Sequence, residues 1–483
     1  MTFFPGEKFS RETDGSPERY ARVAVTDGED GVTTRVTLRS PDGAVSEAED
    51  SEPWRRDGAD RTRKVSAGRA FFNAAVRLTG YRPPWGIMTG VRPSKLAMEF
   101  LSSGMTPEKS AAELSSSYLA GPEKARLAVS VALAERGLVS PGDCGECSVY
   151  AAIPFCPTRC DYCSFVSYAS PRLLSLIPEY LRRLADDISY TEELIRELGL
   201  RVSTVYIGGG TPTVLDPSQL DFLLTALDPL SRGAREFTLE AGRPDTITDE
   251  KLAVAASHGV GRISVNTQTL NEAVLAGIGR RHTAEQFFRA FEAGRRAGIG
   301  TINVDLIAGL PGDDPESFGK TCRAVTDLRP ENLTVHTFTV KKSAKLREEG
   351  VYDREGRDAE TSVAIAARTA ADAGYAPYYM YRQKNTVGNL ENVGYSVPGR
   401  ECLYNVFMME EIHSIFACGA SAVTKLVSPG EVGGSKVIKR IFEPKYPYEY
   451  LREREEGAAA AERKTRRAEI TAFCREHGLG THV

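Results

Sequence analysis

The chain has 483 residues, of which 41% are hydrophobic and 26% are charged, a composition typical of a globular protein with two or three domains. Its net charge of −4 and pI near 6.0 provide no global positive field for nucleic acid. Nine cysteines, concentrated in one cluster, do not resemble a secreted disulfide framework. The sequence shows neither a membrane-spanning apolar run nor a signal-peptide pattern, so a reducing cytoplasm is the expected location.

Residues 1–145 are predicted to form a separate α+β region. Alternating apolar and polar residues over 20–25 and 32–38, on either side of an Asp- and Gly-rich turn, predict a β-hairpin. The acidic and polar stretch 40–60 is expected to be an exposed loop. Helical periodicity with start and stop signals predicts helices that cover 64–79, 96–101, 107–119 and 122–136.

Two features of this region have both a ligand-binding and a structural interpretation. Arg92 and Lys95 precede a predicted helix, where they could bind an anion, although solvated basic side chains are the more ordinary interpretation. Cys144 and Cys147 form a C-x2-C pair in the linker 141–147. Two thiols do not complete a metal site, so a linker without metal is expected.

From residue 149 onward, short apolar runs alternate with amphipathic segments. The runs, each expected to be a strand, are 149–153, 204–207, 237–240, 262–265, 301–307 and 333–340. The segments 178–198 and 284–297 carry apolar stripes and are followed by the stop signals Gly199 and Gly298. This alternation predicts βα units, a parallel sheet and a partial or closed barrel. In such barrels the active site lies at the carboxyl ends of the strands.

Three cysteines follow the first predicted strand in a C-x3-C-x2-C loop: Cys156, Cys160 and Cys163. A [4Fe-4S] cluster held by three cysteines keeps one iron without a protein ligand, and that iron can bind a small molecule. The alternatives are three unrelated buried cysteines or a structural zinc loop. Zinc sites need a fourth ligand and usually pair two such motifs across a long gap, so the cluster is the favoured interpretation.

Polar or glycine residues also stand within the other predicted strands or just after them, toward their carboxyl ends. They are Gly208–Thr213, Glu240, Asn266 with Gln268, Asp305 with Gly309–Gly312, and His336. Singly, each has a structural interpretation, such as a turn, a surface carboxylate or a helix-capping amide. Together they predict a ring of polar groups around one mouth of the barrel.

This ring suits a ligand with an amine, a carboxylate, a sugar and a base. Carbonyl groups at Gly208–Gly210 and the carboxylate of Glu240 can accept hydrogen bonds from an amine, because glycine allows close backbone approach. Gln268 and Asp305 can bond hydroxyls or a nucleobase edge, and Arg280 can clamp a carboxylate. S-adenosylmethionine carries all of these groups, and its amino and carboxylate groups could chelate the open iron.

The cysteine loop with an aromatic residue before its last cysteine, followed by a glycine-rich strand end, resembles the radical SAM superfamily. The ordered series continues with Tyr150, the Ile153-Pro154-Phe155 segment, Gln268, Gly279-Arg280 and Asn303–Gly312. It is similar to the oxygen-independent coproporphyrinogen III oxidase (coproporphyrinogen dehydrogenase) family. The resemblance covers residues 149–345, and Ala417–Val423 is similar to the small-residue loop that follows the barrel in that family.

The resemblance implies an α/β fold with a radical SAM partial (β/α)6 barrel at 146–345. It would lie between the N-terminal α+β region, 1–145, and a C-terminal mixed, substrate-facing domain, 346–483. Cys156, Cys160 and Cys163 would ligate the [4Fe-4S] cluster, and Tyr150, assigned as catalytic, would flank S-adenosylmethionine together with Tyr162. The residues expected to hold S-adenosylmethionine are Gly209, Gly210, Thr211, Glu240, Gln268, Arg280 and Asp305.

The resemblance also implies a reaction and its partners. One electron, supplied by a small flavodoxin- or ferredoxin-type protein, would cleave S-adenosylmethionine to methionine and a 5′-deoxyadenosyl radical. That radical would abstract hydrogen from a propionate of coproporphyrinogen III, and loss of carbon dioxide would leave a vinyl group. The cofactor supplies the difficult chemistry, while the protein supplies placement and exclusion of water.

One departure from the family pattern concerns the substrate. The founding oxidases carry a fourth cysteine two residues after the last cluster ligand, and this chain has Phe165 there. Related members without that cysteine include haem chaperones and haem-modifying enzymes. The chaperones carry a C-terminal His-Asn-Tyr-Trp motif, whereas neither tryptophan of this chain lies beyond residue 85. The N-terminal region and the segment 378–385 resemble a distinct branch described as coproporphyrinogen dehydrogenase.

The C-terminal third contains candidate substrate contacts. Arg382, Lys384 and Lys425 could pair with propionates, although solvated surface charge is an equally good interpretation. Cys402 could quench a radical or bind metal, but a lone cysteine is more often a small buried hydrophobe. The charged residues of 451–483 predict a solvated terminal helix.

Overall fold

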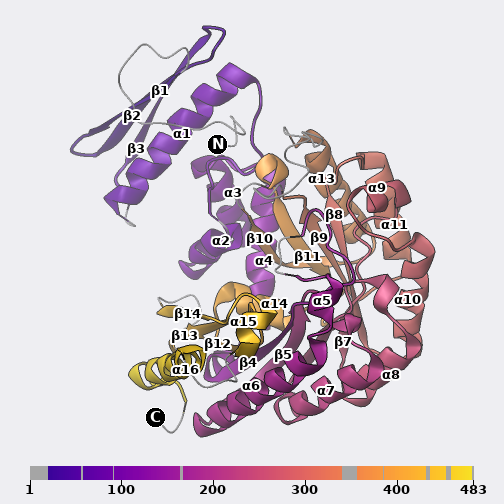
Figure 1. Ribbon diagram of the computed structural model, residues 1–483. Helices are drawn as coiled ribbons and strands as arrows, with labels where there is room; N and C mark the ends of the chain where they lie inside the picture. Colours follow the sequence, from indigo (N-terminus) through magenta and orange to yellow (C-terminus); the bar gives the residue numbers. More distant parts are fainter. Residues whose placement is uncertain are drawn as a thin grey trace. The chain divides into compact units, whose positions relative to one another are not determined.

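The computed structural model describes residues 20–55, 58–90, 92–163, 167–339, 356–383, 386–430, 436–452 and 458–480. The chain forms two compact units, shown in Figure 1. One comprises Met1–Leu133, Arg354–Gly356 and Met380–Leu390; the other comprises Ala134–Asp353, Arg357–Tyr379 and Glu391–Val483. The three-region division predicted from sequence therefore differs from this grouping, because most of the C-terminal third belongs to the same unit as the predicted barrel.

A three-stranded antiparallel sheet and one long helix begin the first unit. The strands are β1 (Tyr20–Asp27), β2 (Gly31–Arg39) and β3 (Val45–Pro53), and the helix is α1 (Ala59–Thr79). The predicted hairpin is confirmed, with Val25 opposite Thr34 in the register of β1 and β2. Val36 and Leu38 of β2 are buried against Ala70 and Ala74 of α1, so the apolar face of the sheet forms a small core with the helix.

The expectation of an exposed loop over 40–60 is wrong, because its centre forms β3. Ser46 and Ala48 are buried beside α1, whereas Glu47 and Glu49 point outward. The outward carboxylates bond neighbours on β2: Glu49 lies 2.6 Å from the Arg35 guanidinium, and Thr37 donates to Glu47 at 2.9 Å. Small residues thus alternate with acidic ones at the period of a strand.

The remaining predicted N-terminal helices are confirmed with small shifts of their ends. They are α2 (Pro93–Ser102), α3 (Pro107–Ser117) and α4 (Pro122–Leu138). Each begins with proline at its first or second position, where the missing N–H costs nothing. The 3₁₀ turn Pro141–Gly145 follows α4 and lies in the second unit, which begins at Ala134. Cys147 is a fully buried residue of the first strand of the central sheet, and Cys144 is half-buried in the turn before it.

The second unit is built on a large mixed sheet whose centre is parallel. Its six consecutive parallel strands are β4 (Glu146–Ile153), β5 (Arg201–Gly209), β6 (Glu236–Glu240), β7 (Arg262–Ser264), β8 (Thr301–Ala308) and β9 (Asn332–Thr337). They coincide with the six runs predicted from sequence, and residue 340 of the last run lies outside the described residues. The predicted (β/α)6 core is confirmed.

Five more strands extend the sheet beyond this core. They are β10 (Ala376–Arg382), β11 (Glu391–Ser396), β12 (Ser414–Cys418), β13 (Val423–Val427) and β14 (Ile438–Phe442). The strand order is β10-β11-β9-β8-β7-β6-β5-β4-β12-β13-β14, with β12 parallel to β4 and β11 antiparallel to β9. Within the described residues this order has two ends, so the barrel is partial.

Helices line the outer side of the parallel strands (Figure 1). They are α6 (Ile177–Glu197), α7 (Pro217–Ser231), α8 (Asp249–Ser257), α9 (Glu272–Gly277), α10 (Ala284–Arg296), α11 (Pro315–Asp327) and α13 (Arg357–Asp372), and the short α5 (Pro171–Leu174) follows the cysteine loop. The predicted helix 178–198 corresponds to α6, whose buried residues include Leu181, Leu184 and Ile188. Its apolar stripe therefore faces the sheet, as the period of 3.6 residues requires.

Three C-terminal helices complete the unit: α14 (Leu403–Glu410), α15 (Pro447–Arg452) and α16 (Ala458–Glu476). The prediction of a terminal helix is confirmed, but it is not simply solvated. Phe473 and Cys474 of α16 are buried, and Arg463 and Arg467 lie 2.9 and 3.2 Å from Asp187 of α6. These ion pairs hold α16 against α6, one of the helices that cover the sheet.

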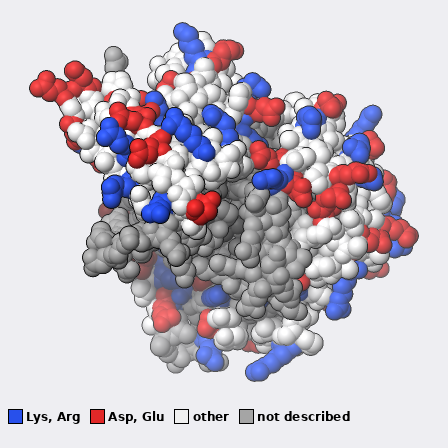
Figure 2. Space-filling model, turned by 90° about the horizontal axis from the view of Figure 1, so that it is seen from above, with Lys and Arg blue, Asp and Glu red and all other residues white. Residues whose placement is uncertain are grey.

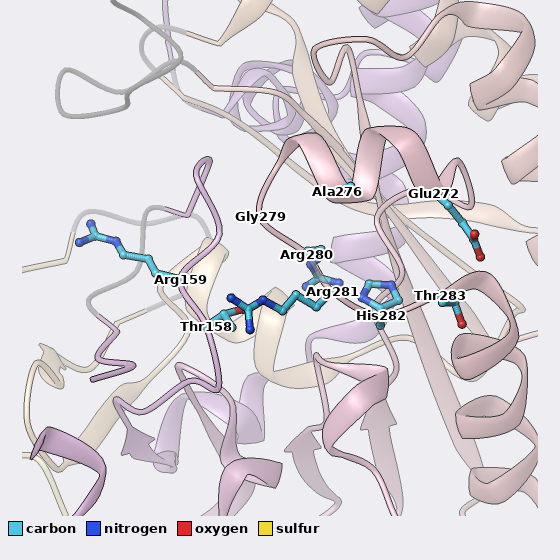
Figure 3. Close-up of a pocket in the computed structure, with 9 residues that line it drawn as sticks. All are labelled: Thr158, Arg159, Glu272, Ala276, Gly279, Arg280, Arg281, His282 and Thr283. Carbon is cyan, nitrogen blue, oxygen red and sulfur yellow. The ribbon is translucent and has the colours of Figure 1, made fainter. Parts of the chain in front are cut away.

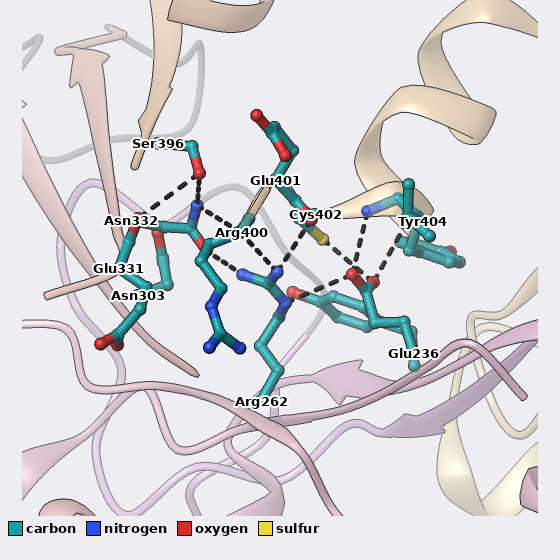
Figure 4. Close-up of polar contacts among 12 residues, drawn as sticks. Glu236, Arg262, Asn303, Glu331, Asn332, Ser396, Arg400, Glu401, Cys402 and Tyr404 are labelled. Atoms are coloured by element: carbon teal, nitrogen blue, oxygen red, sulfur yellow. Dashed lines mark hydrogen bonds and ion pairs between the residues drawn. The ribbon is translucent and has the colours of Figure 1, made fainter. Parts of the chain in front are cut away.

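A buried polar network joins the amino ends of the parallel strands to the segment before α14 (Figure 4). Glu236 at the start of β6 accepts hydrogen bonds from the backbone N–H groups of Leu403 and Tyr404, at 2.9 and 3.2 Å. Arg262 at the start of β7 lies 3.3 Å from Glu236 and donates to the carbonyls of Arg400 and Glu401. The carboxylate thus satisfies the N–H groups at the amino end of α14 and fixes that helix against the sheet.

Charges of both signs are interspersed on the described surface of the face in Figure 2. This pattern agrees with the small net charge of the chain. In the part of the chain that the structure describes, no helix is long and apolar enough to cross a membrane.

Candidate active site

The cysteine loop leaves the carboxyl end of β4 and is closed at its base by backbone hydrogen bonds. Cys156 donates to the carbonyl of Tyr168 at 3.0 Å, and Tyr168 donates back to Pro154 at 2.9 Å. Inside the loop, the Cys163 N–H donates to the Cys160 carbonyl at 3.1 Å. Cys156 and Cys160 are buried and Cys163 is half-buried. Phe165, the residue that departs from the family pattern, lies outside the described residues.

The glycine-rich end of β5 is packed directly against this loop. Gly210 donates to the Ile153 carbonyl at 2.8 Å, and Thr211 donates to the Phe155 carbonyl at 2.7 Å. The Thr211 hydroxyl lies 3.3 Å from the Cys156 sulfur. A Cβ on Gly210 would be only 2.4 Å from the Phe155 oxygen and 2.9 Å from that sulfur. Glycine is therefore required here by close approach, and Thr211 supports the loop.

Alternate residues of the parallel strands place aromatic and ionisable groups on the inner face of the sheet. Tyr150 of β4 stacks on Tyr206 of β5, with ring centroids 6.1 Å apart, and Tyr206 stacks on Tyr404 of α14 at 4.5 Å. Burial raises the pKa of all three hydroxyls, so they remain protonated. The Tyr206 hydroxyl donates to Glu240 at the end of β6. The tyrosine stack therefore orients this carboxylate.

Glu240 and Asp305 are close enough to affect each other's protonation. Burial, with the negative charge of Asp305, raises the pKa of Glu240 to about 7. Burial also opposes ionisation of Asp305, but hydrogen bonds from His336, Asn303 and Thr334 outweigh it and lower the pKa of that carboxyl. The Asn303 amide donates to Asp305 at 2.7 Å, and the His336 ring nitrogen lies 3.6 Å away. The structure thus brings together a carboxylate that stays ionised and one that titrates near neutrality.

Gln268 continues the edge of the site beyond the end of β7 in an unusual backbone conformation. Its φ angle is 71°, in the left-handed region that few residues other than glycine adopt. Its backbone bonds to β8 on both sides, donating to the Asp305 carbonyl at 3.0 Å and accepting from Ile307 at 2.9 Å. Its side chain is buried, and Oε1 has no hydrogen-bond partner among the described residues. Strain and an unsatisfied buried acceptor at one residue are typical of a ligand-binding position.

Arg280 lies beneath the cysteine loop and ties two strand ends together. Its terminal nitrogens donate to the carbonyls of Asn266 and Gly242, the latter at 3.0 Å. Tyr162 and Cys160 are its charged or polar neighbours on the loop side. The guanidinium is thus engaged with the backbone, and the carboxylate clamp expected from sequence stays a prediction.

The three cysteines fit a [4Fe-4S] cluster better than a single metal ion. Among the described residues, no three His, Cys, Asp or Glu side chains converge to hold one ion. In a cubane cluster each thiolate binds a different iron, so the sulfurs surround the cluster and do not meet at a point. The thiols come from one loop, and Gly210 leaves the Cys156 sulfur free of a neighbouring Cβ. The residues present therefore fit the cluster.

A pocket of about 650 Å³ opens between the cysteine loop and the start of α10 (Figure 3). It is lined by Thr158, Arg159, Glu272, Ala276, Gly279, Arg280, Arg281, His282 and Thr283. Burial, with the nearby Arg280, lowers the pKa of His282 to about 3, so its ring is neutral at physiological pH. Neither ring nitrogen has a hydrogen-bond partner among the described residues. The pocket lies on the Arg280 side of the loop.

Comparison with known proteins assigns the family. Residues 150–325 match the radical SAM superfamily. The chain is also 39% identical, over 373 residues, to the oxygen-independent coproporphyrinogen-III oxidase-like protein HemZ of Bacillus subtilis (strain 168), covering 75% of this chain and 74% of that protein. The chain belongs to this radical SAM family. Its superfamily uses a [4Fe-4S] cluster and S-adenosylmethionine, which confirms the predicted cofactors.

The chain is also similar to a protein named as a chaperone and to a solved oxidase structure. Over 282 residues the chain is 31% identical to the heme chaperone HemW of Lactococcus lactis subsp. lactis (strain IL1403), covering 57% of this chain and 68% of that protein. The solved structure of coproporphyrinogen III oxidase (HemN) from Escherichia coli matches with a TM-score of 0.51 and 22% identity, covering 68% of this chain and 73% of that one. The structural match supports the radical SAM fold.

Two candidate substrate contacts in this radical SAM protein are internal. Arg382 is buried, donates to the Met88 carbonyl at 2.6 Å and packs over the Trp85 ring. Lys425 is buried, lies 3.1 Å from Glu411 and donates to the Met408 carbonyl at 2.9 Å. Because both cations are engaged within the fold, the suggestion that they pair with propionates is not supported. Lys384 lies outside the described residues.

Sequence reasoning missed several residues that shape the radical SAM site. Tyr206 donates to Glu240 and stacks on Tyr404, and Arg243 lies 3.7 Å from the Cys160 sulfur. Tyr206 stands at an inward position of a predicted strand, and the alternation of side chains could have identified it. Arg243 follows the predicted strand end at Glu240 by three residues, within an Arg-Pro-Asp turn. Cys402 donates to Glu236 at 3.3 Å and is a buried structural thiol.

Replacing Glu240 with Gln is expected to weaken S-adenosylmethionine binding about 10- to 100-fold at pH 8, because the charge-assisted hydrogen bond that the sequence predicts from the amine to Glu240 would be lost. The native affinity should itself fall as the pH drops below 7, where Glu240 becomes protonated. Because the pKa of Glu240 is higher in the folded protein than in the unfolded chain, the protonated carboxyl stabilises the fold at low pH. This contribution to the free energy of unfolding is lost as the pH rises through 7. E240Q should therefore be more stable than the native protein at pH 8, by about 1–3 kcal/mol.

Calorimetric titration and thermal unfolding from pH 6 to 8.5 measure both effects of E240Q. Glu316→Gln is the matched control, because Glu316 is an exposed carboxylate that pairs with Lys320 on α11. An E240Q affinity equal to that of the native protein at pH 8 would contradict the assignment of Glu240 to the amine.

Proposed function

We propose that this radical SAM enzyme oxidatively decarboxylates the propionate side chains of coproporphyrinogen III to vinyl groups. The similarity to the oxidase-like relative from Bacillus subtilis, which extends over three-quarters of both chains, carries this proposal. The polar ring around the carboxyl ends of β4–β9 supports the radical chemistry of the proposal, because it would offer hydrogen-bonding groups to the polar parts of S-adenosylmethionine. The enzyme would act in the cytoplasm, with a flavodoxin- or ferredoxin-type protein as electron donor.

Each residue of the ring has a proposed role. Cys156, Cys160 and Cys163 would hold the cluster, and Tyr150 and Tyr162 would flank it and exclude water. Ionised Glu240 and the strand-end carbonyls of Gly209 and Gly210 would accept hydrogen bonds from the amine of S-adenosylmethionine. Asp305 and Gln268 would bind its hydroxyls or base, and Arg280 would contribute positive charge near its carboxylate.

The cofactor pair supplies a carbon radical by one-electron cleavage of S-adenosylmethionine when both components are bound. The protein then has to hold one propionate within reach of that radical. Removal of a hydrogen atom, release of carbon dioxide and transfer of one further electron to an acceptor convert the propionate to a vinyl group. The buried tyrosines beside Glu240 would keep this region dry.

A haem-binding chaperone without turnover is the second candidate function. It is favoured by the similarity to proteins named heme chaperone HemW and by Phe165 in place of the family's fourth cysteine. Action of the radical on haem or another tetrapyrrole is a variant of the first proposal. The same residues of the cysteine loop would hold the cluster in each case.

Anaerobic incubation with S-adenosylmethionine, reductant and coproporphyrinogen III distinguishes these functions. The oxidase proposal expects protoporphyrinogen IX, with carbon dioxide and 5′-deoxyadenosine formed in proportion to the vinyl groups. Cleavage of S-adenosylmethionine without any vinyl product would contradict the substrate assignment. A stable haem complex with no turnover would support the chaperone.

A further inference from the structure

Arg243 lies at the cysteine loop without being part of it. It follows β6 and is only 3% exposed. Its Nη1 donates to the Thr158 hydroxyl at 2.9 Å and lies 3.7 Å from the Cys160 sulfur. The first contact fixes a residue between two of the cysteines, and the second is a charge-assisted N–H···S hydrogen bond.

Asp245 holds the Arg243 guanidinium in this orientation. Two parallel hydrogen bonds join them: Nε to Oδ1 and Nη2 to Oδ2, each at 3.0 Å. This bidentate contact uses two nitrogens and leaves Nη1 facing the loop. Burial alone would favour a protonated Asp245, but Arg243 outweighs it and lowers the pKa of the carboxyl. Asp245 is therefore an ionised partner that holds the guanidinium with its Nη1 toward Cys160.

Two of the three cysteines, Cys156 and Cys160, consequently have different electrostatic surroundings. The Cys156 sulfur has the neutral hydroxyl of Thr211 beside it. The Cys160 sulfur has Arg243 on one side and the buried Arg280 as a second cationic neighbour. Hydrogen bonds to cluster sulfurs and nearby charge set the reduction potential of iron–sulfur clusters over a wide range. Adding an electron makes the cluster more negative, so a donated N–H and a positive charge favour the reduced state.

We propose that Arg243, oriented by Asp245, is a positioning residue that raises the reduction potential of the cluster through its hydrogen bond to Cys160. The inference rests on the proposed function in that Cys160 is taken as a cluster ligand. The reaction affected is the gain of one electron by the oxidised cluster from its donor, with no proton or ligand exchanged. Easier reduction would allow a weaker donor to supply that electron.

The test compares cluster potentials of anaerobically reconstituted proteins by redox titration with dithionite, followed by electron paramagnetic resonance. The double variant R243Q/D245N removes both charges together and leaves no buried unpaired ion. Its ratio of reduced to oxidised cluster at a fixed potential is expected to fall about tenfold, a shift of about 59 mV to more negative values. The variant R243K keeps the charge and should shift less.

The exposed pair Arg296 and Asp249, 2.9 Å apart, provides the matched control R296Q/D249N. This variant removes the same two charges away from the loop and should titrate like the native protein. A R243Q/D245N protein with intact cluster and unchanged potential overturns the inference. Loss of the cluster from a folded R243K protein also overturns it, because the residue is then required for assembly of the loop. A native protein that binds no cluster contradicts the proposed function itself.

Discussion

Replacing Cys160 with Ala is expected to abolish cluster binding and, with it, cleavage of S-adenosylmethionine. Cys160 is the central ligand of the C-x3-C-x2-C loop, and its sulfur faces the positive charge of Arg243. With one thiolate removed, two cysteines remain for the cluster, which needs three from this loop. Iron content after anaerobic reconstitution should fall from about four atoms per chain to near zero, with loss of the iron–sulfur absorbance.

Cys322→Ala is the matched control for this experiment. Cys322 lies on α11, is 0% exposed where Cys160 is 9% exposed, and is not among the cysteines of the loop. Its replacement removes a buried thiol at a small cost in stability and should leave the cluster intact. An intact iron–sulfur absorbance in C160A, with native iron content, would contradict the assignment of the cysteine loop.

The parallel core could be predicted because its strands are buried on both sides. In the sequence such strands appear as continuous apolar runs, and each is followed by a helix with an apolar stripe. The run 204–207 illustrates this, because it forms the middle of β5. β3 was missed because its inward residues, such as Ser46 and Ala48, are small and are buried only by α1. Their alternation with glutamates resembles a polar loop in composition, although its period is that of a strand.

The site residues could be predicted where strand geometry dictates their place. Glu240 ends β6 and Asp305 lies on β8, and both strands pair in parallel with β7 between them, so the parallel topology brings the two carboxylates to the same region of the sheet. The position of Gln268 beside them depends on a left-handed backbone conformation that propensity does not reveal. Arg243 was missed for a related reason, since a polar Arg-Pro-Asp turn gives no sign of being buried.

For two charged residues in the C-terminal third, the sequence suggested a functional role that the structure does not support. Arg382 and Lys425 stand in aromatic or glycine-rich segments and suggested contacts with an acidic substrate. The fold buries each of them against backbone carbonyls, and Lys425 also pairs with Glu411. Burial of a cation depends on partners far away in sequence, such as Met88 for Arg382, and no local pattern encodes it.

Replacing Gly210 with Ala is expected to displace the cysteine loop from β5 and to prevent assembly of the cluster. The new Cβ would be 2.4 Å from the Phe155 oxygen and 2.9 Å from the Cys156 sulfur, both well inside contact distance. The strand end cannot move away easily, because Gly210 and Thr211 donate to Ile153 and Phe155 at 2.8 and 2.7 Å. Relieving the clash therefore breaks these hydrogen bonds, at about 1–3 kcal/mol for each buried group left unpaired.

Gly277→Ala separates this effect from a general effect of adding a methyl group. Gly277 ends α9, and a Cβ there meets no atom within 4 Å. Alanine at that position should be neutral or stabilise the helix by up to about 1 kcal/mol. Thermal unfolding and iron content of both variants, measured side by side, give the comparison. If G210A reconstitutes to native iron content with an unchanged melting temperature, close packing of the glycine strand against the cysteine loop is not what holds the Cys156 sulfur in place.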